Sequence, residues 1–430
     1  MEGFSRVGVA AVCAAALVLA PAAGASSQSS LDVVKRGLAR AVARGWLDSA
    51  DAKADGAIAY RATRAIPRLR DPQAHNLAAV LGEVAAMAKV YTAPRALALF
   101  SMLRLNTFYL SRHPMPGSGR DVIDAEDGVL YRSFPGRGLQ FHPLGNFARL
   151  GNLVLSGRDA DAAELAESLV DRGVPNGPAL TWEYYFPFDG GRAPWTSGMA
   201  QAVAASALAR TDYLPEARRA YLALPRGLLI WLKSGPWVRL YRFSTAEVLN
   251  AQLQASISLS IYGKLSQDAE AAGLGDRLAA TALALLPRFD TGSWSLYSLG
   301  GAEAPLNYHR YVVSLLKTLA QRTEDPAWTS WYQRFNRYLT VPPEIDAKRP
   351  LPAVGSRRPA RISFWLSKSS RVTLSVGGSA LQVWLARGYH TLLWSPGRRR
   401  AGAYAASLSA VDQAGNRAWV RLAPVIVRRG

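Results

Sequence analysis

The chain has 430 residues, of which 49% are hydrophobic and 19% charged. Because single hydrophobic cores stop growing at roughly 250 to 300 residues, this length predicts two domains, and the composition excludes extended disorder. Lysine and arginine outnumber aspartate and glutamate by 51 to 31, giving a formal net charge of +20. This excess favours a polyanionic partner, although free use of arginine in a GC-rich genome explains it equally well. Nucleic acid is not expected, since zinc-finger spacing and paired-aromatic sheet motifs are both missing.

Residues 1–25 have the pattern of a secretory signal peptide. Arg6 precedes a short apolar run from Val7 to Leu19, and small residues follow up to Ala25. The run is too short for a comfortable membrane span. We therefore expect cleavage near Ala25 and a secreted or cell-envelope protein without a stable membrane span, with an uncleaved signal anchor as the alternative. Cys13 is the only cysteine, so the mature chain would have no thiol for a disulfide or a metal.

Residues 31–340 are predicted to be mainly helical, because apolar residues recur at helical spacing and prolines separate the helices. After several N-terminal helices, paired helices are expected at 143–155 with 160–172, 200–210 with 214–224, 248–263 with 269–286, and 308–321 with 326–339. A β-hairpin is predicted at 128–141 and an aromatic strand at 180–188. Helical hairpins that alternate with aromatic loops predict an α/α toroid, an incomplete helical barrel, although no strict repeat supports it.

Three loops rich in aromatic and small residues are expected to form one active-site rim, since loops on a rigid scaffold often carry the chemistry. They comprise Pro194 to Gln201, Trp237 to Asn250 and Phe289 to His309. In the first of them, Thr196 or Ser197 is placed to cap the following helix.

The C-terminal part is predicted to be a separate all-β domain. Residues 341–358 contain several prolines and basic residues and are expected to form a linker. From 359 to 430 the hydrophobic pattern has a period of two, which predicts a β-sandwich. Its last hairpin, Gly402 to Asn416, resembles that of the immunoglobulin-like domains appended to bacterial secreted proteins. We expect no catalysis from this part.

Metal and nucleotide chemistry are not expected. Only His142 and His309 lie near the aromatic loops, which is a poor set of metal ligands. There is no G-x-S-x-G elbow and no phosphate-binding glycine loop. A glycosidase would need two facing carboxylates; the candidates Glu183, Asp189, Glu247 and Asp290 form no convincing pair.

Tyrosines are the most frequent reactive residues of these loops. A phenol has an unperturbed pKa of about 10, so nearby cations are needed to favour the phenolate. Arg239 and Arg242 flank Tyr241, and Arg310 follows Tyr308 closely. Opposed tyrosines suit the removal of a proton from one face of a carbon beside a carboxylate and its return to the other face. The alternative is that each ring only stacks on a sugar.

Five motifs resemble, in the same order, those of the D-glucuronyl C5-epimerase catalytic domain. They are Gly138 to Asn152, Pro194 to Gln201, Tyr241 with Val248-Leu249-Asn250, Asp290 to Tyr297, and Tyr308-His309. The resemblance covers residues 128 to about 338. It implies inversion at carbon 5 of a hexuronic acid in a polysaccharide, as in the conversion of D-glucuronate to L-iduronate, without a metal or cofactor.

The resemblance also implies the site residues. Tyr297 and Tyr308, with Tyr241 as a third, would be the acid/base groups. The candidate substrate-binding residues are Trp195, Gln201, Arg239, Arg242, Asn250, His309, Arg310, Glu183, Tyr185 and His142.

The sequence departs from the family pattern just before Tyr241. Where the family commonly has Glu-Glu-Tyr-Pro, this chain has Arg239-Leu240-Tyr241-Arg242. If either carboxylate acts as a base in the family, this protein has to rely on tyrosines or act on another uronic acid, or it is inactive. A polysaccharide lyase and a noncatalytic polysaccharide-binding protein of the envelope are the alternatives, and a homodimer is left open.

Overall fold

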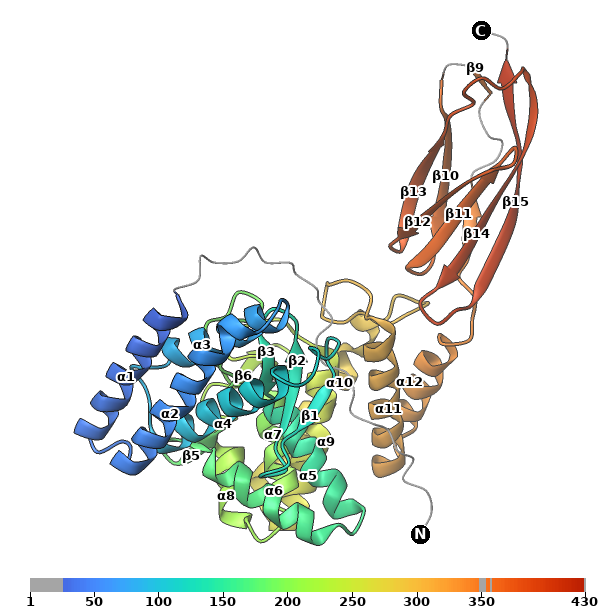
Figure 1. Cartoon of the computed structure of the whole chain (residues 1–430). Coiled ribbons are helices and arrows are strands. Elements are labelled where there is room, and N and C mark those ends of the chain that lie inside the picture. The colour runs from blue at the N-terminus through green and yellow to red at the C-terminus, as the bar shows by residue number, and fades with distance from the viewer. Residues whose placement is uncertain (1–25, 348–352, 356–357, 429–430) are drawn as a thin grey trace. The chain divides into compact units, whose positions relative to one another are not determined.

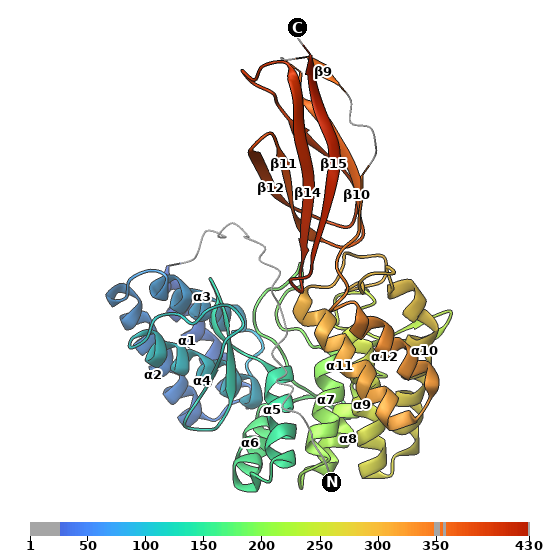
Figure 2. The ribbon, with the colours of Figure 1, turned by 90° about the vertical axis from the view of Figure 1, so that its right-hand side faces the viewer.

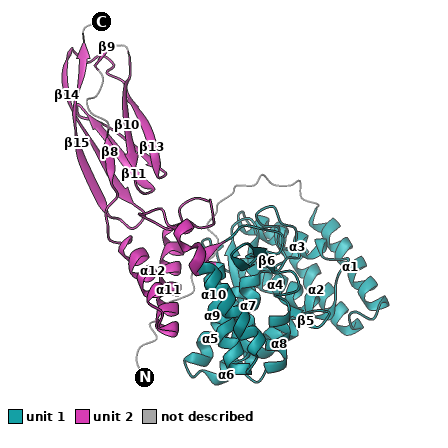
Figure 3. Cartoon of the chain, turned by 180° about the vertical axis from the view of Figure 1, so that it is seen from behind, with its two compact units in different colours: residues 1–247, 251–282 teal, residues 248–250, 283–430 magenta. Residues whose placement is uncertain are grey.

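The computed structural model describes residues 26–347, 353–355 and 358–428. Within these residues the chain forms twelve α-helices, one short 3₁₀ helix and fifteen β-strands (Figure 1). It divides into two compact units, one of residues 1–247 and 251–282 and the other of residues 248–250 and 283–430 (Figure 3). The predicted signal peptide lies outside the described residues. None of the described helices is long and apolar enough to cross a membrane.

The first unit is mainly helical, as its sequence predicts. Its helices are α1 Ser27–Ala43, α2 Ser49–Ala65, α3 Gln73–Ala86, α4 Ala93–Leu110, α5 Pro143–Leu155, α6 Asp159–Asp171, α7 Gly198–Leu208, α8 Leu214–Leu222, and most of α9 Leu249–Ser266 and α10 Ala269–Phe289. Proline stands in the first turn of α4, α5 and α8, where its fixed φ favours helix formation and its missing N–H costs nothing.

Neighbouring helices of the first unit pack in pairs around a common core. Contacts join α1 with α2, α3 with α4, α5 with α6 and α7 with α8. Every residue of α7 is buried, and its small side chains allow close approach to α5, which it also contacts. The helix that starts at the first aromatic loop is therefore completely enclosed, and it holds that loop firmly.

Short strands connect these helices. They are β1 Asp121–Ile123, β2 Leu130–Phe134, β3 Gly138–Phe141, β4 Val174–Asn176, β5 Ala179–Thr181, β6 Leu229–Leu232 and β7 Gly235–Val238. The hairpin predicted at 128–141 is confirmed as β2 and β3, and Figure 1 shows it beside α3 and α4. The strand predicted at 180–188 is wrong in length, because after β5 only isolated bridges remain at Tyr184 and Phe188. The β6–β7 hairpin was not predicted.

The second unit combines two helices with an all-β domain. The helices α11 Leu306–Thr323 and α12 Pro326–Arg337 pack on each other. The strands are β8 Ile345–Ala347, β9 Val354–Gly355, β10 Ala360–Leu366, β11 Ser370–Val376, β12 Ser379–Leu385, β13 Gly388–Trp394, β14 Gly402–Asp412 and β15 Arg417–Arg428.

Two sheets of the β domain share one hydrophobic core, so the predicted β-sandwich is confirmed. Their strand orders are β13-β10-β8 and β12-β11-β14-β15-β9, and Figure 2 shows β14 and β15 as a long hairpin. Phe364 from the first sheet and Leu408 from the second belong to the same buried cluster. The domain begins earlier than expected, because β8 and β9 lie inside the segment predicted to be a linker and pair with β10 and β15.

A buried lysine ties the β domain to the helical pair of the second unit. Lys368 Nζ donates to Tyr338 O over 2.8 Å, to Val341 O, and to Asp412 Oδ2 over 3.1 Å. Both charged side chains are almost completely buried, with 2% and 1% of their surface exposed. Burial lowers the pKa of Lys368, while the Asp412 carboxylate partly offsets this effect. The β domain and the helical pair are therefore joined by a buried ammonium group, whose charge the Asp412 carboxylate compensates.

The turn between β14 and β15 makes a second connection to the helices. Gln413 Oε1 accepts from the Leu306 N–H over 3.0 Å, and its Nε2 donates to Ala304 O over 3.3 Å. Asn416 Nδ2 donates to Leu339 O over 3.0 Å. Since the first N–H groups of a helix have no partner within it, Gln413 caps the start of α11 from a position 107 residues further along the chain.

Candidate active site

Trp195 lies in a dense aromatic cluster of the first unit. Its ring stacks on Tyr184 at 4.1 Å between centroids, and it meets Tyr241 edge to face at 5.1 Å. Phe188 and Phe243 also contact Tyr241, at 5.5 and 5.4 Å. Trp195 Nε1 donates to the Phe186 carbonyl over 2.7 Å, so the ring is fixed in its plane. This cluster holds Tyr241 in place, with 8% of its surface exposed.

The turn that carries Tyr241 is bonded to the start of α7. Gly198 N donates to Arg239 O over 3.0 Å, and Arg242 N donates to Thr196 O over 2.9 Å. Ser197 is the N-cap of α7 and accepts from the Ala200 N–H over 3.3 Å, which confirms one of the two predicted caps. Arg239 is half-buried and Arg242 exposed, so two guanidinium groups border the Tyr241 turn.

We expect Gly198→Ala to destabilise the first unit. A methyl group at this position would lie 2.6 Å from Arg239 O and from a methyl group of Val238, and overpacking of this kind costs about 1–3 kcal/mol. Urea unfolding would measure the loss. The matched control is Gly151→Ala in α5, where no atom lies within 4 Å of the added methyl; an equal loss there would contradict the steric argument.

Four further candidates of the first unit are bonded within the protein. The side-chain amide of Gln201 bonds the backbone of Leu180 and Trp182 over 2.8 and 3.1 Å. Glu183 receives two hydrogen bonds from Arg95, of 2.8 and 2.9 Å. In this structure both residues anchor the loop backbone, and the partner Arg95 was not anticipated from sequence because it lies 88 residues away.

His142 and Tyr185 are also buried, with 1% of each exposed. His142 caps α5 by accepting from Gly145 N over 2.9 Å, and burial, followed by the nearby Arg132, holds its pKa well below the usual value. Burial and the neighbouring Glu183 raise the pKa of Tyr185 well above 10. A neutral helix cap and a phenol that keeps its proton are poor candidates for proton transfer.

Tyr297 and Tyr308 lie together in the second unit. Their rings meet edge to face, with 4.9 Å between centroids. Tyr297 is half-buried, whereas 7% of Tyr308 is exposed. Rings this close are in direct contact, so a sugar ring does not fit between them. The structure therefore presents these two tyrosines as a single pair.

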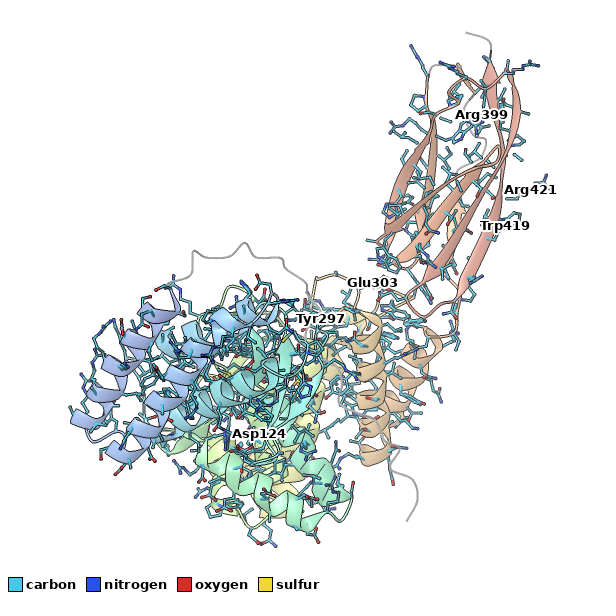
Figure 4. All side chains as sticks on the ribbon, viewed as in Figure 1. Asp124, Tyr297, Glu303, Arg399, Trp419 and Arg421 are labelled. Carbon is cyan, nitrogen blue, oxygen red and sulfur yellow. The ribbon has the colours of Figure 1, made fainter. Side chains whose placement is uncertain are left out.

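The loop that carries Tyr297 is internally braced. Its backbone makes bridges between Asp290 and Ser295 and between Leu296 and Glu303, and Tyr297 N donates to Ala302 O over 3.0 Å. Figure 4 labels Tyr297 and Glu303 on this loop, ahead of α11. Asp290 is not a free carboxylate, because it accepts from Arg334 Nε over 2.6 Å and from the Tyr338 hydroxyl over 2.9 Å.

His309 links this loop to both helices of the second unit. Its Nε2 is 3.0 Å from Phe335 O, an acceptor, so Nε2 carries the proton and Nδ1 accepts from Ser295 Oγ over 2.7 Å. The ring stacks on Trp294 at 3.9 Å, and none of it is exposed. His309 thus positions the tyrosine loop. Its partner Ser295 was not anticipated, because nothing in the sequence marks the contact.

The stability of the second unit should depend on the protonation of His309. Burial lowers the pKa of His309 to about 4, against about 6.5 in an unfolded chain. Between these values the unfolded state binds the extra proton, so the free energy of unfolding should fall by about 3 kcal/mol as the pH drops from about 7 to 4. Denaturant unfolding at several pH values would measure this. His309→Gln should remove this pH dependence of the free energy of unfolding. An unchanged pH dependence would contradict its assignment to His309.

The remaining two candidates also belong to the second unit. Asn250 is buried near the start of α9, and Arg310 is exposed on α11, two residues after Tyr308. The backbone of this α9 segment joins the tyrosine loop, since Leu249 N donates to Tyr297 O over 3.3 Å. Among the described residues no group of three His, Cys, Asp or Glu side chains could hold a metal ion.

The protein is mainly helical, its aromatic loops are braced by hydrogen bonds, and two of its phenol groups are in contact. An enzyme that transfers protons would have such features. Residues 176–337 match the model of the family described as D-glucuronyl C5-epimerase C-terminus. The match covers less than half of the 430 residues, and it supports an epimerase-like function for this segment, which is a kind of isomerase activity. The match contains all three candidate tyrosines but starts after the motif at Gly138 to Asn152, so His142 lies outside it.

Other comparisons add little. None of the curated proteins matches the chain. Among solved structures, the endoglucanase from Komagataeibacter sucrofermentans is similar, with 14% identity over 47% of this chain and 71% of its own, at a TM-score of 0.32. A TM-score this low supports no conclusion about fold or activity.

Proposed function

We propose that the protein is an exported uronyl C5-epimerase. It would invert carbon 5 of hexuronic acid residues, of the D-glucuronate to L-iduronate type, within an acidic polysaccharide. The observation that carries this proposal is the contact between Tyr297 and Tyr308 inside the matched segment. The net charge of +20 agrees with an acidic polymer as substrate.

The reaction needs one acid/base group on each face of carbon 5. A tyrosinate takes the proton from carbon 5, so that the C–H bond breaks, a phenol O–H bond forms, and the electron pair is held by the carboxylate as an enediolate. A second tyrosine then donates its proton to the opposite face. Because Tyr297 and Tyr308 are in contact within the second unit, we assign one face of carbon 5 to this pair. Tyr241, in the first unit, is kept as the third candidate acid/base group.

Cations have to make this proton acidic. The α-proton of a carboxylate becomes acidic only when the carboxylate charge is partly neutralised, and positively charged donors achieve this best in a desolvated site. We assign this role to Arg310, which lies two residues after Tyr308 in the same unit. Arg239 and Arg242 flank Tyr241, where the family commonly has two glutamates and a proline, and we propose that they bind uronate carboxylates at that turn.

The departure at Leu240 is structural as well as chemical. Only 7% of this side chain is exposed, so a glutamate there would be a buried carboxylate. Such groups are costly unless they are paired. Leu240→Glu would restore one carboxylate of the family pattern. We expect this variant to lower the stability of the first unit, so its activity has to be compared with that of wild type per folded molecule.

Exchange with deuterated water tests the proposed reaction. Incubation with heparosan, a glucuronan or alginate should place deuterium at carbon 5 while the chain length stays constant. A lyase would instead expel the oxygen at carbon 4 and produce an unsaturated sugar that absorbs in the ultraviolet. The absence of both signals with all three polymers would refute an enzymatic role on these substrates.

The finer features of architecture and location belong to the same proposal. The helix pairs α1–α2, α3–α4, α5–α6, α7–α8 and α11–α12 are what an α/α toroid is built from, and we propose that the helical part has this fold. We also propose that the β-sandwich is immunoglobulin-like, and that residues 1–25 direct export to the cell envelope or the medium.

A further inference from the structure

The outer face of the five-stranded sheet carries exposed tryptophans and arginines. In β11, residues 372, 374 and 376 are buried in the core, so 371, 373 and 375 point outward. Trp384 of β12 is paired directly with Arg371. Trp419 lies on β15, opposite Ser409 of β14, which itself pairs with the outward residue Thr373. Cross-strand partners share a face, so both tryptophans lie on the outer side of the sheet.

Both rings are unusually exposed for tryptophan. The exposed fractions are 54% for Trp384 and 63% for Trp419, and Figure 4 shows Trp419 and Arg421 directed away from the sandwich. Arg417 and Arg421 lie two residues before and after Trp419, and therefore on its face of the strand. Each tryptophan thus has an arginine as its immediate neighbour.

The strands of this face carry no exposed carboxylate that could balance Arg371 and Arg417. The strands β11, β12, β14 and β15 are completely described and contain one acidic residue, Asp412, which is buried against Lys368. Neither Arg371 nor Arg417 forms an ion pair with any described residue. The positive charge of the face is therefore available to an anionic ligand.

The space between the tryptophans is lined by short polar side chains. Thr373, Ser375, Ser407 and Ser409 present short hydroxyl side chains between β12 and β15. With strands spaced about 4.8 Å apart, the three strand steps from Trp384 to Trp419 cover roughly 14 Å. A face of this kind offers ring surfaces, hydroxyl groups and guanidinium groups over the length of a few sugar residues.

A pocket lies between this face and the start of α11. It has a volume of about 490 Å³ and is lined by Arg371, Trp384 and Val411, by the turn 412–415, and by Leu306. Leu306 is the first residue of α11, and Tyr308 follows two residues later. A polymer held on the face would thus continue, within the second unit, towards the residues assigned to catalysis.

We propose that this face is a binding site for an acidic polysaccharide, the class of substrate that the proposed function implies and on which this inference rests. Tryptophan rings would stack on the apolar faces of the sugars. Arginines would bind uronate carboxylates through paired N–H groups. The β domain then retains the polymer while the helical part acts on it.

Binding by the full chain tests this proposal, with Tyr297→Phe as the background so that turnover is slow during the titration. Affinity for heparosan, a glucuronan and alginate would be measured by titration calorimetry. Trp384→Ala and Trp419→Ala should each weaken binding by about five- to tenfold, as expected for the loss of one aromatic contact. The matched controls are Tyr389→Ala, an aromatic residue of the other sheet that is 80% exposed, and Arg361→Ala on the outward side of β10.

Three results would overturn the proposal: no binding of any of the three polymers, equal losses in the controls, or tighter binding of single-stranded DNA that depends on the same tryptophans. This binding test and the exchange test of the proposed function can fail independently. If wild type shows no exchange at carbon 5 but binding still depends on Trp384, the enzymatic proposal fails and the binding site stands. If exchange occurs and Trp384→Ala changes neither affinity nor KM for the polymer, only the binding site fails.

Discussion

Replacing Tyr297 or Tyr308 with phenylalanine is expected to lower the rate of epimerisation by about 10²- to 10⁴-fold, the usual contribution of a general acid or base. Phenylalanine preserves the edge-to-face ring contact of 4.9 Å and removes only the hydroxyl group, so the fold should be retained. The rate would be followed by deuterium incorporation at carbon 5, with Tyr60→Phe, an exposed tyrosine of α2, as the control. Wild-type rates in both variants would exclude the assigned roles.

The direction of exchange separates the two faces of the reaction. If Tyr297 and Tyr308 serve one face, a variant of the pair should still exchange the carbon 5 proton of one epimer and lose exchange from the other. The comparison requires polymers that start as D-glucuronate and as L-iduronate. Equal losses from both epimers in every variant would contradict the assignment of the pair to one face.

Lys368→Met is expected to cost about 3–5 kcal/mol of stability, because removing one partner of a buried ion pair leaves the other charge uncompensated. In the variant, the Asp412 carboxylate and the carbonyls of Tyr338 and Val341 lose the hydrogen bonds that Lys368 donates to them. Hydrogen exchange of amides in β11 and β14 would report the loss in the second unit. Lys317→Met, at an exposed position of α11, is the matched control and should change stability by less than about 0.5 kcal/mol.

The same variant should lower activity through the tyrosine loop. Ser369, next to Lys368, donates its N–H to Glu303 Oε2 over 2.7 Å, and the ammonium group lies 5.4 Å from the centre of the Trp294 ring. Loss of these contacts releases the loop that carries Tyr297. Full activity in a destabilised Lys368→Met protein would show that the β domain does not position the loop.

Local signals predicted most of the fold. Proline and the Ser197 cap mark helix starts that the structure confirms at α4, α5 and α7, and period-two patterning predicted the sandwich. The β6–β7 hairpin was missed because each strand has only four residues and the second strand begins with a Gly-Pro pair. Short strands with such turns give little periodicity.

The candidate site was harder to predict, because its supporting contacts are distant in sequence. Motif order located the tyrosines, but the same motifs also contain Gln201 and His142, whose polar atoms bond within the protein. Sequence spacing does not distinguish a polar residue that anchors a loop from one that faces a ligand. The ion pair of Lys368 with Asp412 spans 44 residues and leaves no local pattern.

Gln413 has a practical consequence for work with shortened chains. Its amide occupies the first N–H of α11, the helix on which Tyr308 is placed. A protein truncated after residue 340, or reduced to the matched segment 176–337, would expose that helix end to solvent and let its first turn fray. Loss of turnover in such fragments would then reflect an unwound helix start rather than missing chemistry, so enzymology belongs on the intact polypeptide.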